Sequence, residues 1–317
     1  MIACNYSLGN TGVGCTPLLA VAKKVIVVPI YDSTQARNRI TLATTLNQAF
    51  FDALVNQSDA TKRWYPLPFI KNAESDRGDN IVEAFNDGSS IFIQQGTKAF
   101  SAVIVEKDAP ARLLKFLNTF RNIDFGIYIV DKENNLIGMN NTAGYLDPIR
   151  VDAASWGPKF VDPKDQNCQK IMLNFNWHVN ELDQNIDVLA ASELVTGTDV
   201  ASLEGLVDVY ATVSLITTTG FRIELYTLYG TQKNPVRDTG RLVADFISTV
   251  GAATSKIRDT TDNADITISS VTETATPGIY DVVITPAQTT GNVLVPFLTF
   301  KGRDYQNVKN LTTITIP

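Results

Sequence analysis

The sequence has 317 residues, 44% of them hydrophobic and 19% charged, which is long enough for two domains that each bury a core. Its 27 Lys and Arg against 33 Asp and Glu give a net charge of −6, so it lacks the clustered basic excess that tight nucleic-acid binding needs. No apolar run approaches the roughly 18 residues of a membrane-spanning helix, and three cysteines predict neither a disulfide framework nor a zinc site.

The first segments predict an arm followed by a strand. Residues 1–24 are rich in small residues and glycine without a clear period, which is typical of an arm that a neighbouring subunit orders. The β-branched run 25–31 predicts an edge strand or a strand that ends at Pro29, because proline lacks the ladder donor. Residues 45–54 fit a short helix or a strand pair. Trp64 lies in a proline-extended apolar segment that we expect in the core or at an interface.

Residues 81–106 read as a β-hairpin, which we expect to form part of a β-rich domain. A turn signal at Asn86, Asp87 and Gly88 precedes two apolar runs, 91–93 and 99–105, that flank a second expected turn at Gln94, Gln95 and Gly96. One alternating face of these strands is expected in the core, and the other along a lumen or a neighbouring subunit. Residues 71–80, which lead into this stretch, are charged and predict a loop.

The next segments combine one helix with further strands. Residues 109–120 place apolar side chains on one face and predict a helix. Residues 125–130 and 136–139 predict two strands joined by a polar turn. Residues 171–179 alternate apolar and polar side chains throughout, which predicts a strand with one buried face. Residues 181–194 fit either a helix or a loop excursion.

Composition changes near residue 217, where the chain becomes rich in threonine and is punctuated by glycine and proline. Short strands are expected at 221–228, 266–271, 279–284, 293–300 and 312–316, at a spacing typical of a sandwich. The segment SSVTETATPGIYDVVITPAQ resembles the end of a bacterial immunoglobulin-like module. A second domain is therefore expected to begin between Ile216 and Phe221.

No residue pattern in the chain predicts catalysis. His178 is the single histidine, and its place on the polar face of a strand favours a surface or interface hydrogen bonder over a catalytic base. Glu181, Asp183 and Asp187 could bind a cation at one edge, but they lack calcium-loop spacing, so solvated acids are expected. We therefore predict no enzymatic activity, no cofactor and no metal.

Five segments in this order resemble tail tube proteins of tailed bacteriophages, especially those that infect Bacteroidetes-type hosts. The resemblance covers roughly residues 20–195 and is carried by VVPIYDSTQARNRI, EAFNDGSSIFIQQGTKAFSAVIV, APARLLKFLNTF, DFGIYIVDKENNLIG and KIMLNFNWHVNE. It implies a β-barrel or sandwich flanked by one helix, in protomers that form rings, of six by the same resemblance, which stack into a DNA-conducting tube. Members from non-contractile tails often carry a C-terminal immunoglobulin-like domain.

The sequence thus predicts a mainly β protein with an arm at 1–24, a tail-tube-like β domain at 25–216 and an immunoglobulin-like sandwich at 217–317. The expected role is a major tail tube subunit that is assembled in the host cytoplasm and located in the virion tail. Its expected partners are copies of itself, other virion proteins and DNA in passage, with no membrane. Alternatives are a capsid, head–tail connector or decoration protein, a carbohydrate- or cell-surface-binding β-sandwich protein and, least favoured, a hydrolase.

Subunit contacts are expected at residues 1–24 and 71–80, and at the end of the hairpin. The candidate contact residues are Gln94, Gln95, Thr97, Lys98, Arg77, Asp79 and Trp64.

Overall fold

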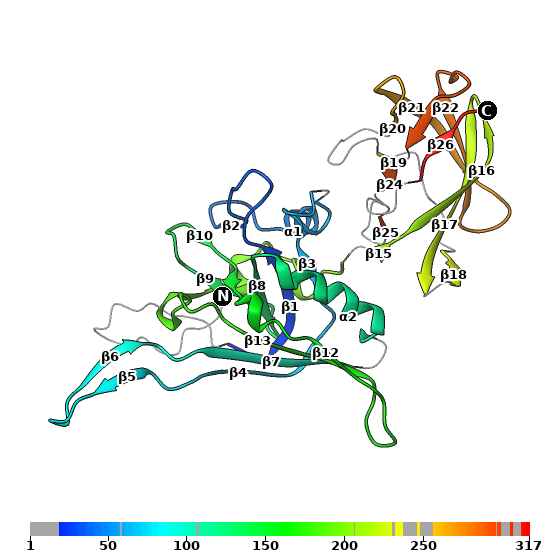
Figure 1. Ribbon diagram of the computed structural model, residues 1–317. Coiled ribbons are helices and arrows are strands. Elements are labelled where there is room, and N and C mark those ends of the chain that lie inside the picture. Colours follow the sequence, from blue (N-terminus) through cyan, green and yellow to red (C-terminus); the bar gives the residue numbers. More distant parts are fainter. Residues whose placement is uncertain are drawn as a thin grey trace. The chain divides into compact units, whose positions relative to one another are not determined.

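The computed structural model describes residues 19–57, 59–105, 108–205, 207–229, 232–236, 246–247, 256–295, 297–298, 305–306 and 312–317. Most of the elements are strands, which confirms the mainly β expectation. The chain divides into two compact units (Figure 1), unit 1 of Met1–Val55 and Thr61–Glu204 and unit 2 of Asn56–Ala60 and Gly205–Pro317. Residues 1–18, most of the expected arm, lie outside the described residues. The last three residues of the expected arm, 22–24, already belong to the first strand.

The strands of unit 1 are β1 Ala22–Pro29, β2 Ile40–Thr41, β3 Tyr65–Pro66, β4 Lys71–Arg77, β5 Ile81–Ala84, β6 Ser90–Gln94, β7 Lys98–Val105, β8 Phe125–Asp131, β9 Leu136–Met139, β10 Tyr145–Leu146, β11 Ile149–Arg150, β12 Lys159–Val161, β13 Lys170–Asn176 and β14 Ile186–Leu189. Its α-helices are α1 Gln48–Val55 and α2 Ala111–Leu117. Its short 3-10 helices are η2 Asn118–Asn122, η3 Ala153–Ser155, η4 Asp183–Asn185, η5 Ala191–Glu193 and η6 Val200–Ser202.

Two antiparallel sheets of unit 1 form a nearly closed barrel. One has the order β14-β9-β8-β1-β3 with β11 paired to β8, and the other has the order β12-β13-β7-β4. At one seam the Ile70 amide donates to the Lys23 carbonyl at 2.9 Å, and at the other the Asp152 amide donates to the Asn176 carbonyl at 2.9 Å. These bonds join the edges of the two sheets and enclose a shared core.

Strand β1 is buried on both faces, which explains its uninterrupted apolar run. Val25 and Val27 pack inside the barrel, whereas Ile26 and Val28 belong to a second core on the outer side of the same sheet. A strand covered on both faces needs apolar side chains at consecutive positions. Because β1 ends at Pro29 and pairs with both β3 and β8, the expectation that it ends at the proline is confirmed and the edge-strand alternative is wrong.

The predicted helix at 109–120 is α2 followed by η2, and its apolar face packs on the barrel core. Leu117 is fully buried and its carbonyl accepts a hydrogen bond from Trp156 Nε1 at 2.8 Å. Phe120 contacts Phe125 and Tyr65 with ring centroids 5.6 and 5.4 Å apart. The first helix, α1, occupies the 45–54 segment, so the helical alternative holds there.

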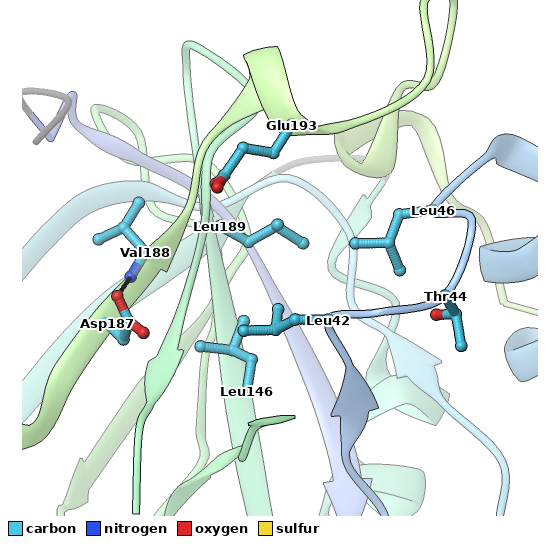
Figure 2. Close-up of a pocket in the computed structure, with 8 residues that line it drawn as sticks. All are labelled: Leu42, Thr44, Leu46, Leu146, Asp187, Val188, Leu189 and Glu193. Carbon is cyan, nitrogen blue, oxygen red and sulfur yellow. Dashed lines mark hydrogen bonds between the residues drawn. The ribbon is translucent and has the colours of Figure 1, made fainter. Parts of the chain in front are cut away.

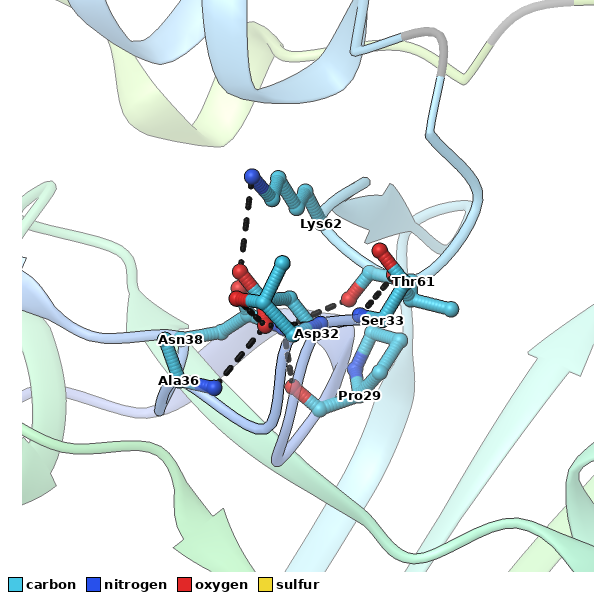
Figure 3. A network of polar contacts seen from close by, with 8 residues as sticks. Pro29, Asp32, Ser33, Ala36, Asn38, Thr61 and Lys62 are labelled. Carbon is cyan, nitrogen blue, oxygen red and sulfur yellow. Dashed lines mark hydrogen bonds and ion pairs between the residues drawn. The ribbon is translucent and has the colours of Figure 1, made fainter.

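A polar network fixes the loop that follows β1 (Figure 3). Asp32 Oδ1 accepts hydrogen bonds from the Thr34 amide and hydroxyl and from the Ala36 amide, at 2.7–2.8 Å. Asn38 Nδ2 donates to the carbonyl oxygens of Pro29 and Thr61, which ties the loop to a segment far along the chain. Side-chain hydrogen bonds to backbone groups therefore help to fix this part of unit 1.

The strands of unit 2 are β15 Val207–Asp208, β16 Tyr210–Thr217, β17 Gly220–Tyr229, β18 Gln232–Pro235, β19 Phe246–Ile247, β20 Lys256–Asp259, β21 Ala264–Glu273, β22 Ile279–Thr285, β23 Val293–Val295, β24 Phe297–Leu298, β25 Tyr305–Gln306 and β26 Ile314–Thr315. The largest sheet has the order β16-β17-β22-β21-β20-β23-β26, with β18 paired to β17. It surrounds its own apolar core, which includes Ile223, Ile266, Tyr280 and Ile284.

The C-terminal segment of unit 2 begins at Gly205, earlier than the domain boundary expected near residue 217. Strand β16 lies on the unit 2 side because it pairs with β17 over most of its length. A β-hairpin keeps its two strands together, so the composition change at 217 falls at the turn inside a hairpin rather than between domains. The immunoglobulin-like assignment of this unit stays a prediction.

Two local predictions differ from the structure. The charged segment 71–80 was expected to be a loop, but Lys71–Arg77 is strand β4, whose pairing with β7 outweighs its polar composition. Residues 181–194 form η4, β14 and η5 rather than a helix, because β14 pairs with β9. Within the described residues, no helix has both the length and the apolar character needed to cross a bilayer.

Candidate functional site

The projecting hairpin of β5 and β6 is the candidate functional site. It continues the strand pair of β4 and β7 away from the barrel (Figure 1). Its turn is well made, because Phe85 and Ser89 are joined by a backbone hydrogen bond of 2.8 Å and Asp87 Oδ1 accepts from the Ser89 amide and hydroxyl. Gly88 has a φ of +84°, a conformation that glycine adopts readily.

The structure has one turn in this stretch, where the sequence predicts two. The Asn86, Asp87 and Gly88 signal does mark the turn, but Gln94 and Gln95 do not mark a second one. Strand β6 pairs with β5, and β7 pairs with β4 and β13, so the two apolar runs lie on one continuous arm of the hairpin. The expected core-facing alternation holds for β7, where Phe100 and Ile104 are buried, and fails for β5 and β6, where every residue is exposed.

The exposed side chains of the hairpin include several large apolar ones. Six of them are between 42% and 58% exposed: Ile81, Val82, Phe85, Ile91, Phe92 and Ile93. In the described part of the chain, β5 and β6 pair with each other and with no other strand. An isolated two-stranded hairpin is marginal in water, and a cluster of exposed apolar residues marks an interaction surface. The arrangement can therefore bind another protein surface.

The root of the hairpin carries an ionic cluster. Arg77 ends β4, Lys98 begins β7, and the two residues stand opposite each other in the strand pair. Asp183, in η4, accepts from Arg77 Nε at 2.7 Å and from Lys98 Nζ at 2.8 Å. These hydrogen bonds, the strongest of which comes from Arg77, lower the pKa of Asp183 to about 2. The carboxylate therefore stays charged at neutral pH and links the hairpin to the barrel.

Close backbone packing accompanies this cluster. A side chain on Gly96 would place its Cβ 2.1 Å from the Gly78 carbonyl oxygen. The backbone segments at residues 78 and 96 therefore approach each other more closely than a residue with a Cβ would allow. The Gly78 amide donates to the Thr97 carbonyl at 3.0 Å across the same point. The link between the projecting hairpin and the barrel strands is therefore narrow and specifically bonded.

The seven predicted contact residues have different environments. Gln94, Thr97 and Asp79 are exposed near the root, and Gln95 is half-buried there. Arg77 and Lys98 are mostly buried in the ionic cluster, where they bind within the chain. Trp64 is 2% exposed and lies 4.9 Å from the Tyr128 ring in the second core, so its assignment as a contact residue is wrong. In the sequence, an aromatic residue just before a proline-containing apolar segment is equally compatible with the core and with an interface.

The apolar residues that form the site were visible in the sequence, but their exposure was not. The sequence predicts that one alternating face of these strands lies in the core. It also predicts that Asp183 is a solvated acid, since sequence alone does not show that residues 77, 98 and 183 meet. Pairing of β4 with β7 and the position of η4 bring them together.

A second candidate, a pocket of about 160 Å³ beside β14, offers little chemistry (Figure 2). Its carboxylates are already engaged: Asp187 accepts from the Val188 amide and the Asn140 side chain, and Glu193 accepts from the Ala190 amide. The remaining lining is mostly leucine. His178, which accepts from the Asn180 amide at 3.3 Å, is not paired with a nucleophile in the described residues.

Among the residues that the structure describes, no three His, Cys, Asp or Glu side chains gather into a metal-binding group. Comparison with protein-family models and with curated protein sequences finds no match to this chain.

Proposed function

We propose that this protein is a structural virion protein, the major tail tube subunit of a tailed bacteriophage, without enzymatic activity. Copies of the chain would form rings, six to a ring by the resemblance, that stack into a tube in the virion tail after assembly in the host cytoplasm. The observation that carries the proposal is the projecting hairpin, whose strands expose apolar side chains on both faces. The order of segments that resembles tail tube proteins supports the same role.

A second copy of the chain is the simplest partner for this hairpin. A surface on one subunit that binds a different surface on the next makes a heterologous contact, which closes into a ring or continues along an axis. Within the described part of the chain the outer edges of β5 and β6 pair with no other strand, which favours pairing with a neighbouring subunit, and burial of their side chains removes apolar area from water. Repetition of one such contact builds an extended assembly from a single protein.

The charge of the chain is compatible with a conduit for DNA. Each basic side chain that contacts a phosphate adds affinity through counterion release, which would retain DNA instead of letting it pass. The net charge of −6 limits such retention. Unit 2, as an immunoglobulin-like domain, would then lie outside the conduit and suit a tail without a contractile sheath.

The hairpin can be tested by replacing Phe92 and Ile93 with serine in the full chain. Both side chains are more than half exposed, so we expect the substitutions to leave the fold intact and to abolish rings and tubes in negative-stain images and in sedimentation velocity. Ile123 and Val195, which are 44% and 45% exposed and lie outside the hairpin, replaced together by serine provide the matched control. The control should assemble like the wild type.

Discrete outcomes separate this proposal from its alternatives. Isolated wild-type particles under all assembly conditions, together with glycan binding, would instead support a cell-surface-binding protein. Closed shells would support a capsid or decoration protein. Tubes formed equally well by the serine variant would show that assembly does not use the hairpin.

A further inference from the structure

The root of the hairpin contains a like-charged pair that needs compensation. Arg77 and Lys98 are direct cross-strand partners, at the point where the barrel strands end and the projecting hairpin begins. Like charges directly opposite each other destabilise a strand pair. Their side chains are only 15% and 14% exposed, so water screens the repulsion poorly.

Asp183 provides this compensation from outside the hairpin. Its two carboxylate oxygens accept from Arg77 Nε and Nη2, at 2.7 and 3.0 Å, and from Lys98 Nζ at 2.8 Å. Paired hydrogen bonds between a guanidinium and a carboxylate fix direction as well as distance. Asp183 belongs to η4, which leads directly into β14 of the barrel. One residue of η4 therefore bonds to the ends of both barrel strands, β4 and β7, from which the hairpin continues.

Arg77 and Lys98 make further contacts that also attach the hairpin root to the barrel. Arg77 also donates to the carbonyl oxygens of Gly96, on the returning strand, and of Glu181, beside η4. Lys98 Nζ lies 4.1 Å from the centroid of the Trp177 ring, a cation–π contact with the end of β13. The hairpin root is thus bonded to the end of β13 and to the segment at η4, both of which lie far from residues 77–98 in the sequence.

We propose that Asp183 is a positioning residue for self-assembly, which fixes the ends of β4 and β7 at the root of the hairpin and so presents its apolar tip in one orientation. The proposal rests on the proposed function, in which this tip contacts a second copy of the chain. A segment that is already held in its bound orientation loses less conformational entropy on binding, so association is faster and tighter. Without the carboxylate, the cationic pair separates and the hairpin samples many orientations.

The test is Asp183→Asn in the full chain, with Asp183→Glu as the conservative variant. Asp281→Asn is the matched control, because Asp281 accepts from Arg222 in unit 2 at 2.7 and 2.9 Å in the same two-bond arrangement. Two quantities are measured: hydrogen exchange of the amides in residues 76–98 in the unassembled protein, and the rate of assembly followed by light scattering.

We expect Asp183→Asn to raise exchange in residues 76–98 roughly tenfold, as for loss of charge-assisted hydrogen bonds, while exchange in β8 stays unchanged. Assembly should slow roughly tenfold at equal protein concentration. Asp183→Glu should recover part of both effects, and Asp281→Asn should show neither.

Exchange at the wild-type level in Asp183→Asn would overturn the proposed lock, whether or not the protein assembles. Faster exchange with an unchanged assembly rate would show that the lock has no role in association. A wild type that never assembles would instead contradict the proposed function, and the exchange measurement would still decide whether Asp183 fixes the hairpin.

Discussion

Single carboxylates in unit 1 behave differently according to the donors around them. Asp32 accepts three hydrogen bonds, led by the one from the Thr34 hydroxyl, and its pKa is lowered to about 2. Asp147 is 2% exposed, and within the described residues neither of its carboxylate oxygens accepts a hydrogen bond. Burial therefore raises the pKa of Asp147, against the attraction of Arg37 at 4.0 Å, and burial likewise raises the pKa of Glu181.

We expect Asp147→Asn to raise the free energy of unfolding at pH 7, on the order of 1 kcal/mol, because a neutral amide avoids the burial of a charge. A carboxyl whose folded pKa is raised stabilises the fold fully below its unfolded pKa of about 3.9, and this stabilisation is lost as pH rises through the folded pKa. The advantage of the asparagine variant should therefore shrink as pH falls from 7 to about 4. Urea unfolding across this range measures it.

Asp281→Asn is a control for which we expect the opposite change in stability at pH 7. The bonds from Arg222 lower the pKa of Asp281, so its carboxylate stabilises the fold at neutral pH and this contribution is lost as pH falls. The variant should be less stable than the wild type at pH 7. A parallel loss of stability in Asp147→Asn at pH 7 would show that Arg37 outweighs burial at that site.

At the scale of elements, strands with opposite compositions occupy neighbouring places in the barrel. β1 is apolar at consecutive positions because both of its faces are covered, whereas β4 is charged and largely exposed but still pairs with β7. The hairpin then continues from β4 and β7 through a link where Gly96 passes the Gly78 carbonyl. Close backbone approach at this link, together with the ionic cluster of Arg77, Lys98 and Asp183, joins the projecting part to the barrel.

Gly96→Ala should destabilise unit 1 by about 2 kcal/mol, because the added Cβ would lie 2.1 Å from a backbone oxygen and the strands must shift. Gly157→Ala is the matched control, since its Cβ would meet its nearest atoms at 3.6 and 3.7 Å, an ordinary contact distance. The midpoint of urea unfolding measures both. Equal midpoints for the two variants would show that the link relaxes without cost.

At the scale of the whole molecule, each unit has its own apolar core. The barrel core of unit 1 includes Phe100 and Phe175, whose rings stack with centroids 4.9 Å apart, and the core of unit 2 includes Ile284. A unit with its own core is a candidate for cooperative unfolding by itself, and chains of two such units depart from two-state behaviour.

We expect calorimetry of the unassembled protein to resolve two transitions. Phe175→Ala should lower one of them and Ile284→Ala the other, each by the shift that corresponds to about 3 kcal/mol of lost packing. Each variant should leave the second transition in place. A single transition that both variants shift equally would show that the two units unfold together.

Much of unit 1 could be predicted from sequence because its signals are local. The alternation in 171–177 identifies the buried face of β13, and the apolar face of 109–120 identifies α2. The turn at Asp87 and Gly88 follows from the conformations these residues favour. Strand β4 could not be predicted, because its charged side chains are tolerated only where a partner strand supplies the hydrogen bonds.

The sequence by itself determined the mainly β character, the strand and helix of the barrel core and the apolar content of 81–93. Only the tertiary structure decided that these apolar side chains are exposed, that Trp64 is buried and that Arg77, Lys98 and Asp183 meet. The reason is physical. Periodicity reports which side chains share a face, but whether that face is covered, and which distant charges it meets, depends on strand pairing between segments far apart in the chain.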